Sequence, residues 1–286
     1  MLLDGETQMD IKQILQQNNI RFNKQFGQNF LTDSALLGSV VADSGITADD
    51  VVVEIGAGAG TLTRALAKVA KQVIAFEIDK NLEKILGITL AEFDNVKVVM
   101  GDVMKYSMAQ IHDLVGNKPF KVVANIPYYI TTPLIMRFVE ESDLARSLTL
   151  TIQKEVADRL ASQHDCKDYG AITVAVQAVA DVEILQVLGR ELFYPAPNVD
   201  SAVVNVMFNR DKFDIGDHAF FRKTVKNSFA MRRKTLVNNL MNAFKMGRDV
   251  AEGILAQMEL PATIRGEALS VEQFVTLAKL IKEKTQ

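Results

Sequence analysis

The chain has 286 residues, of which 48% are apolar and 23% are charged, and its formal net charge is −3 at pH 7. These values predict one large and one small globular domain. No apolar run reaches the roughly 18 residues of a membrane span, the N-terminus lacks a secretory signal pattern, and the single cysteine, Cys166, excludes an internal disulfide. We therefore expect a cytoplasmic protein with no bound metal.

From about residue 32 the chain alternates β-branched runs with helical patterns, which is typical of an α/β fold with a parallel sheet between helices. Apolar runs such as VVVEI and KVVAN favour strands that are covered on both faces. The expected strands are Val51–Ile55, Val73–Glu77, Val96–Met100, Lys121–Ala124, Leu148–Ile152, Val182–Val187 and Ala202–Phe208. The expected helices are one in SALLGSVVADSG that ends near Gly45, then Leu62–Ala70, Asn81–Phe93, Pro133–Glu140 and Gly170–Ala180.

The last third of the chain has a different pattern. The segment FYPAPNVDS is expected to be a rigid loop between the last two strands, and the polar residues 210–217 mark a boundary. Beyond it, apolar residues recur at four-residue spacing, which predicts helices. The predicted organisation is a partly helical or disordered extension over residues 1–20, an α/β domain over 21–209 and a helical domain over 210–286.

The strongest local signal is VVVEIGAGAGTLTRAL, in which a strand, a glycine turn and a helix start follow one another. Gly56, Gly58 and Gly60 allow a sharp turn and a close approach of the backbone to a ligand. The dinucleotide fingerprint needs a glycine where Thr61 stands, and no Gly-Lys-Ser/Thr of a phosphate loop follows. The pattern therefore favours a ligand without a pyrophosphate, bound at the carboxyl ends of the strands.

Two acidic residues stand at the ends of the next two strands. Glu77 ends the second strand, where a carboxylate can accept hydrogen bonds from both hydroxyls of a ribose, in a nicotinamide cofactor as in other nucleotides. Asp102 follows the third strand and can accept a bond from an adenine amine. Either acid alone is equally well interpreted as a solvated carboxylate at a strand end or as a ligand-binding residue. Together, after successive strands of a glycine-turn domain, they favour an adenosyl nucleoside site.

The fourth strand runs into NIPYYITTP. The N6 amine of adenine is a weak nucleophile because its lone pair is delocalised into the ring. The side-chain carbonyl of Asn125 and the backbone carbonyl of Ile126 can accept the two N–H bonds of this amine and favour a pyramidal nitrogen. After the rigid Pro127, Tyr128 can stack on a flipped-out base. This arrangement predicts catalysis by positioning and electrostatics rather than by a strong base.

Five segments occur in one order along the chain: FGQNFL (Phe26–Leu31), VEIGAGAG, NIPYYITTP, QKEVADRL (Gln153–Leu160) and FYPAPNVDSAVV (Phe193–Val204). Together they resemble the KsgA/RsmA family of ribosomal RNA adenine N6,N6-dimethyltransferases, and the likeness runs from about residue 21 to the C-terminal RGEALSVEQF. The resemblance implies a Rossmann-like class I methyltransferase domain with a small helical domain, and S-adenosyl-L-methionine as cofactor. It also implies dimethylation of two adjacent adenosines near the 3′ end of 16S ribosomal RNA, with a role in small-subunit maturation.

The resemblance further implies roles for individual residues. The adenine would lie between Tyr128 and Phe193, beside Asn125, Ile126 and Pro127. Asn198 stands where the family usually has a lysine, so the phosphate contact of that lysine is not carried over. The implied cofactor contacts are Gln28, Asn29, Leu31, Gly56, Gly58, Glu77, Asp102 and Asn125.

Charge is unevenly distributed along the chain. Residues 210–286 contain 14 Lys/Arg and 9 Asp/Glu, whereas residues 1–209 contain 18 and 26. A basic module on an acidic body favours local, salt-sensitive binding of phosphate. The expected partner is therefore small-subunit ribosomal RNA in a pre-ribosomal particle, with the protein a monomer and no membrane involved. The expected RNA contacts lie on the first helices after the boundary: Arg222, Lys223, Lys226, Arg232, Arg233 and Lys234.

Two alternatives stay open. An Erm-type 23S ribosomal RNA methyltransferase shares the glycine turn and the NIPY-type motif, but such proteins are usually basic, whereas this chain has a pI of about 5.7. An assembly factor that acts mainly by binding is the second, although the intact Asn125 and Tyr128 favour catalysis. The whole-chain resemblance disfavours a DNA adenine methyltransferase, and Thr61 disfavours an NAD-dependent dehydrogenase.

Overall fold

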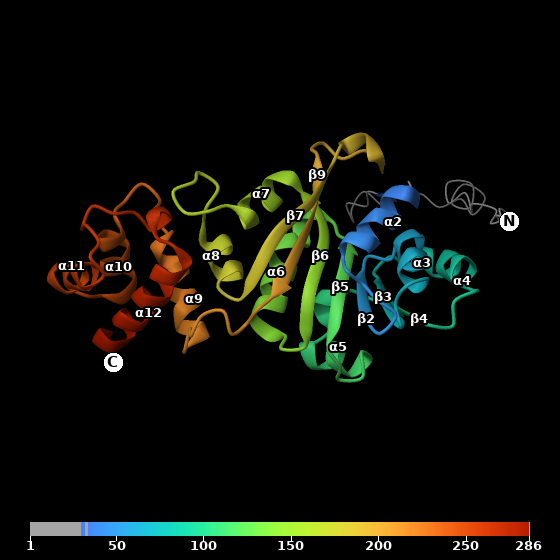
Figure 1. Ribbon diagram of the computed structural model, residues 1–286, viewed down its shortest axis with the longest axis horizontal. Coiled ribbons are helices and arrows are strands. Elements are labelled where there is room, and N and C mark those ends of the chain that lie inside the picture. The colour runs from blue at the N-terminus through green and yellow to red at the C-terminus, as the bar shows by residue number, and fades with distance from the viewer. Residues whose placement is uncertain (1–29, 32–33, 286) are drawn as a thin grey trace. The chain divides into compact units, whose positions relative to one another are not determined.

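A seven-stranded sheet organises the computed structural model, which describes residues 30–31 and 34–285 (Figure 1). Its strand order is β4-β3-β2-β5-β6-β9-β7. The first five strands of this order, from β4 to β6, each pair parallel with the next. All seven predicted strands are confirmed, with some ends longer than expected. Their bounds are β2 Val51–Ile55, β3 Gln72–Glu77, β4 Val96–Met100, β5 Phe120–Asn125, β6 Ala145–Gln153, β7 Ala180–Leu188 and β9 Ser201–Phe208.

The predicted helices of the α/β region are present, and two more were not predicted. The expected helix over 81–93 is shorter: the Asp79 side chain accepts from the amide of Asn81 and starts a 3-10 turn, η2 (Lys80–Leu82), which leads directly into α4, and α4 ends at Thr89. The unpredicted helices are α5 (Met108–Leu114), which begins at a Ser107/Gln110 capping box, and α7 (Lys154–Ala161). The predicted ones are α2 Ser34–Asp43, α3 Thr61–Ala67, α4 Glu83–Thr89, α6 Thr131–Glu141 and α8 Ala171–Gln177.

The segment expected to be only a loop between the last strands contains a short strand. Strand β8 (Phe193–Tyr194) pairs antiparallel with β1 (Phe30–Leu31), in a separate two-stranded sheet. The expectation of a rigid loop is therefore wrong at these two residues, which form a strand. The cause is a pairing partner more than 150 residues earlier in the chain, which a local pattern does not reveal.

The core explains why the strand ends are well positioned. Every residue of β2 is buried, and α3 contacts β3 while α2 packs on α3. Each β2 residue from Val51 to Ile55 has a partner on β3, so the carboxyl ends of the two strands lie next to each other. Because parallel strands end at the same edge, the loops that follow β2, β3, β4 and β5 meet there.

The chain divides into two compact units, and β7 and β9 run from one into the other. The first unit holds the described residues up to Leu134, with 141–153 and 185–205; the second holds 135–140, 154–184 and the described residues from 206. After residue 210 the second unit has no strand among its described residues, and the helices predicted there are confirmed. They are α9 His218–Ser228, α10 Leu236–Phe244, α11 Arg248–Gln257 and α12 Val271–Thr285.

The apolar side chains spaced along these helices form the core of the second unit. Phe221 and Val225 of α9 and Leu236 and Leu240 of α10 are buried, and α9 packs against α12 and α10. The division into a methyltransferase domain over residues 21–209 and an RNA-binding domain over residues 210–286 stays a prediction. None of the helices in the described part of the chain is long and apolar enough to cross a membrane.

Candidate active site

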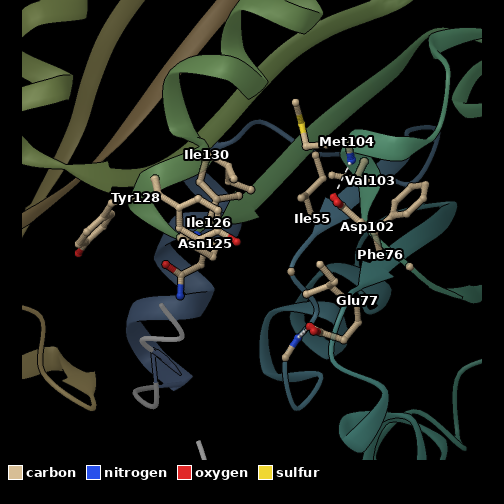
Figure 2. A pocket seen from close by; sticks show the side chains of 16 residues that line it. Ile55, Phe76, Glu77, Asp102, Val103, Met104, Asn125, Ile126, Tyr128 and Ile130 are labelled. Carbon is tan, nitrogen blue, oxygen red and sulfur yellow. Dashed lines mark hydrogen bonds between the residues drawn. The ribbon is translucent and has the colours of Figure 1, made fainter. Parts of the chain in front are cut away.

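A pocket of about 340 Å³ lies in the first unit, at the carboxyl ends of β2, β3, β4 and β5. We call it the strand-end pocket. In Figure 2, Glu77 and Asp102 lie on one side of it, and Asn125, Ile126 and Ile130 lie on the other. Eight of the predicted site residues line it together: Gly56, Gly58, Glu77, Asp102, Asn125, Ile126, Pro127 and Tyr128.

The glycine turn after β2 forms one wall of this pocket. Gly56 has φ 83° and Gly58 has φ 59°, a left-handed backbone that is strained for other residues. The amides of Gly56 and Ala57 donate to the carbonyl oxygen of Phe76, at 2.9 and 3.0 Å, which ties the turn to β3. The turn therefore has a fixed shape and presents backbone rather than side chains to the pocket.

Glu77, at the end of β3, is buried with 3% of its surface exposed. Its Oε2 accepts from the amide of Gly58 at 2.7 Å and its Oε1 accepts from the amide of Asp79 at 2.8 Å. Burial raises the pKa of this carboxyl, while the two backbone N–H bonds act in the opposite direction. A carboxylate can accept further bonds beyond these two, so Glu77 both holds the turn and offers acceptors to a ligand.

Asp102 follows β4 and is half-buried in the pocket wall. Its Oδ1 accepts from the amide of Met104 at 3.0 Å and so caps the 3-10 turn η3 (Val103–Lys105). This bond fixes the carboxylate at the pocket edge, where Figure 2 shows it beside Val103 and Met104. The prediction that strand-end acids converge on one site therefore holds geometrically.

The segment from Asn125 to Tyr128 leaves β5 and forms the opposite wall. Ile126 is buried at 2% exposure, and Pro127 precedes the 3-10 turn η4 (Tyr128–Ile130). Asn125, at the strand end, is half-buried. The polar amide and the aromatic ring of this motif thus border the same cavity as the two strand-end acids.

The orientation of Tyr128 depends on a residue that the sequence did not reveal. The Tyr128 hydroxyl forms a 2.7 Å hydrogen bond with the hydroxyl of Ser201, which is fully buried at the start of β9. Burial raises the pKa of the Tyr128 hydroxyl, with the Ser201 bond acting against it. Ser201 belongs to the FYPAPNVDS segment, but only the tertiary structure brings it to Tyr128, 73 positions away.

The sequence also did not predict the apolar residues of the pocket wall, because apolar residues at strand ends are usually part of the hydrophobic core. Phe76 and Ile78 flank Glu77, and Val103, Met104 and Ile130 are among the other apolar residues of the lining. Ile78 is 39% exposed. An apolar slot with a few polar groups is typical of a small-molecule site.

A second buried acid lies on β2, two residues before the glycine turn. Glu54 is completely buried. Burial raises the pKa of Glu54 to about 8, the Thr63 side chain acts to lower it, and the nearby Glu77 carboxylate acts to raise it further. Glu54 is therefore largely protonated at neutral pH.

Phe193 and Leu31 are predicted site residues that do not line the strand-end pocket. Both are buried in the hydrophobic core around β1 and β8, at 4% and 3% exposure. The two residues pair with each other across these strands. Their roles beside the adenine and the cofactor stay predictions, and Gln28 and Asn29 lie outside the described residues.

The expected RNA contacts form two sets rather than one helical cluster. Arg222, Lys223 and Lys226 lie on α9 as predicted, and Arg222 pairs with Glu140 at 3.2 Å. The helical placement is wrong for residues 232–234, which lie in the turn between α9 and α10. The Thr235 side chain accepts from the amide of Asn238, so α10 begins only at Leu236.

In that turn, one of the three basic side chains is held by the protein itself. Arg232 donates to the carbonyl of Lys167 at 2.8 Å and pairs with Glu267 at 3.3 Å. Arg233 and Lys234 are exposed. RNA binding by all six residues stays a prediction.

The parallel sheet, the glycine turn and the strand-end acids define a class I methyltransferase fold. Solved structures agree: a dimethyladenosine transferase from Plasmodium falciparum has the same fold, with a TM-score of 0.77, 24% identity, and coverage of 89% of this chain and 98% of that one. The 23S rRNA methyltransferase ErmE aligns with a TM-score of 0.68 and 26% identity, over 89% of this chain and 100% of that one.

Sequence comparison identifies the family. Residues 19–283 match the model of the family described as ribosomal RNA adenine dimethylase. Proteins named Ribosomal RNA small subunit methyltransferase A are similar over nearly their whole lengths. The one from Clostridioides difficile is 42% identical over 96% of this chain and 95% of its own, and the one from Lactococcus lactis is 43% identical over 93% and 92%. The chain belongs to the ribosomal RNA adenine dimethylase family.

Proposed function

We propose that the protein transfers methyl groups from S-adenosyl-L-methionine to the N6 amines of two adjacent adenosines near the 3′ end of 16S ribosomal RNA. One observation carries the proposal: the Asn125–Tyr128 segment borders the same cavity as Glu77 and Asp102. A nucleoside site and an amine-binding motif on facing walls are what methyl transfer to adenine requires. The similarity to small subunit methyltransferases A supports the choice of RNA.

The residues fit the cofactor. Glu77 is a buried acid in the pocket wall with acceptor capacity for ribose hydroxyls, and Asp102 has the same capacity for an adenine amine. Ile78, Val103 and Met104 provide apolar surface for the adenine ring. The turn around Gly56 and Gly58 lets the backbone approach the methionine part of the molecule. When bound, S-adenosyl-L-methionine supplies an electrophilic methyl group on a positively charged sulfur.

The residues of the opposite wall act on the target base. The Asn125 side-chain carbonyl and the Ile126 backbone carbonyl accept the two N–H bonds of the adenine amine and direct its lone pair into the cavity. Tyr128 stacks on the flipped-out base, with its ring fixed by Ser201. Because no group in this set is a strong base, the acceleration comes from orientation and from polar groups already in place.

The proposal extends to the partner and its setting. Residues 21–209 act as the methyltransferase domain, and residues 210–286 dock onto RNA phosphates through basic residues, including Arg233 and Lys234. The substrate is small-subunit ribosomal RNA in a pre-ribosomal particle, and the protein works as a monomer in the cytoplasm. Phosphate contacts set register, whereas the folded shape of the RNA selects the target.

Methyl transfer to defined RNA particles tests this function. The protein is incubated with labelled S-adenosyl-L-methionine and either unmethylated small subunits or 23S ribosomal RNA, and the labelled nucleoside is identified. We expect N6,N6-dimethyladenosine near the 3′ end of 16S RNA. Label only in 23S RNA would instead make the chain a 23S rRNA methyltransferase, as ErmE is named. Cofactor binding without transfer to either RNA would contradict the proposal and favour an assembly factor.

A further inference from the structure

The second unit contains a pocket of its own, and one residue of its lining, Lys223, is among the expected RNA contacts. The pocket has a volume of about 460 Å³ and lies where the N-terminus of α9 meets the C-terminal ends of α10 and α12. We call it the helical pocket. Its size falls within the range of roughly 300–1,000 Å³ that is usual for small-ligand sites. Its lining is Asp217, Phe220, Lys223, Ala243, Phe244, Lys245, Lys282 and Thr285.

Two aromatic rings form the apolar part of this pocket. Phe220 and Phe244 are half-buried, and their ring centroids are 5.6 Å apart at an interplanar angle of 43°. The ammonium of Lys223 lies 5.2 Å from the centroid of the Phe244 ring. Half-exposed rings beside positive charge are the combination on which unpaired bases stack.

Three lysines from three different helices provide the polar part. Lys223 comes from α9, Lys245 is the C-cap of α10 with φ 56°, and Lys282 comes from α12. A basic run along one helix is usually a solvated face, but these lysines are dispersed in sequence and meet only in the folded unit. Their convergence therefore marks a place that attracts a phosphate.

One acid, Asp217, also lines the pocket, and its carboxylate is paired with a lysine. Asp217 accepts from the ammonium of Lys282 at 2.8 Å and from the amide of Phe220 at 2.9 Å, as the N-cap of α9. The salt bridge lowers the pKa of Asp217, so it stays ionised. With three lysines against one aspartate, the lining has an excess of two positive charges.

We propose that the helical pocket binds one unpaired nucleotide of the RNA substrate. The base lies against Phe220 and Phe244, and its flanking phosphates lie among Lys223, Lys245 and Lys282. The inference rests on the proposed function for the identity of the RNA. Stacking on a ring tolerates every base, so the pocket anchors the strand rather than reading its sequence. It is a separate anchor from the basic turn at residues 232–234.

The test measures binding of a short, labelled, single-stranded oligoribonucleotide over a range of salt concentrations. The paired substitution Lys223→Gln and Lys245→Gln should weaken binding and lower the salt slope, by about 0.7 for each phosphate that is no longer neutralised. Phe244→Leu keeps apolar volume but removes the ring, and should weaken binding roughly tenfold with little change in slope. Lys284→Gln, an exposed lysine on α12 outside the pocket, is the matched control.

Three results would overturn the inference. The first is binding by the lysine pair variant that equals that of the Lys284→Gln control. The second is an unchanged affinity of Phe244→Leu, and the third is an equal affinity of the wild type for an abasic strand, since either of these means charge attraction without a nucleotide site. Thermal unfolding measures whether Phe244→Leu folds as the wild type does. The single substitution Lys245→Gln changes an exposed side chain, so its effect on binding can be read even if Phe244→Leu is destabilised.

The same proteins separate this inference from the proposed function. Methyl transfer to small subunits by the wild type, with an unchanged KM in the lysine pair variant, would reject the pocket and keep the function. Pocket-dependent binding of the oligonucleotide without any methyl transfer would keep the pocket and reject the function.

Discussion

The strand-end pocket and the helical pocket differ in the interactions that they offer to a ligand. The first is made of a fixed backbone turn, buried acids and apolar walls, where Glu77 is only 3% exposed. The second is made of lysine ammonium groups and half-buried rings in contact with solvent. Buried hydrogen bonds are little affected by salt, whereas exposed charges are screened within about 10 Å at 0.1 M salt. Cofactor affinity should therefore vary little with ionic strength, and RNA affinity should vary strongly.

The largest effect should come from the amine-binding wall. Asn125→Ala removes an acceptor that acts on the reacting nitrogen, and loss of one such group lowers kcat by roughly 100–1,000-fold. The measurement is methyl transfer to small subunits at saturating cofactor. RNA affinity and its salt slope should stay as in the wild type, because the helical pocket is unchanged. Activity within about fivefold of wild type would remove Asn125 from the chemistry.

The next largest effect concerns the cofactor. Glu77→Gln replaces a charged acceptor by a neutral one, and hydrogen bonds to charged groups contribute about 1.5–3 kcal/mol, so affinity should fall roughly 10–100-fold. Calorimetric titration with S-adenosyl-L-methionine measures it. Glu83→Gln, an exposed carboxylate on α4, is the control and should bind as the wild type does. Circular dichroism checks that the turn at Gly58 survives, and equal affinities of the two variants would contradict the role of Glu77.

The buried acid beneath the turn should make stability depend on pH. The pKa of Glu54 is about 8 in the folded chain against 4.5 for an exposed glutamate, so folding takes up a proton between these values. Stability from this group is full below about pH 4.5 and is lost as pH rises toward 8, on the order of 1 kcal/mol per pH unit. Glu54→Gln should remove this dependence.

Urea unfolding of the wild type and Glu54→Gln from pH 5 to about pH 9 measures the effect of Glu54. The curves should diverge as pH rises, with the variant the more stable above pH 8. Parallel curves would mean that Glu54 is charged in the folded protein, contrary to the raised pKa.

The smallest effect should come from the support of Tyr128. Ser201→Ala and Tyr128→Phe each remove the same hydrogen bond, whose net contribution is about 1 kcal/mol, so each should lower kcat/KM by less than about tenfold. The double variant should be no worse than the more affected single variant, because both changes remove one interaction. Strictly additive effects would show that Ser201 does not act through Tyr128.

The strand-end pocket could be predicted from sequence because its parts follow a local rule. A glycine turn comes directly after β2, and Glu77, Asp102 and Asn125 come at the ends of β3, β4 and β5, so the parallel sheet alone brings them together. Order along the chain is enough to infer such a site. The parallel sheet and the helical end of the chain were predictable for the same reason, from the period of the apolar residues.

What could not be predicted depends on contacts between distant segments. The Tyr128–Ser201 bond, the pairing of β1 with β8 and the burial of Phe193 each join residues far apart in sequence. The helical pocket draws its lysines from positions 223, 245 and 282, which share no motif. The turn at residues 232–234 was read as helix because a threonine cap has little weight beside a run of basic residues.

The most direct test of the account compares the wild type with Asn125→Ala in one experiment. Unmethylated small subunits are incubated with labelled S-adenosyl-L-methionine, and the methylated positions of the 16S RNA are mapped over time. The account predicts N6,N6-dimethyladenosine at two adjacent positions near the 3′ end with the wild type, and almost none with the variant. Label in a different nucleoside, or equal label with both proteins, would contradict it.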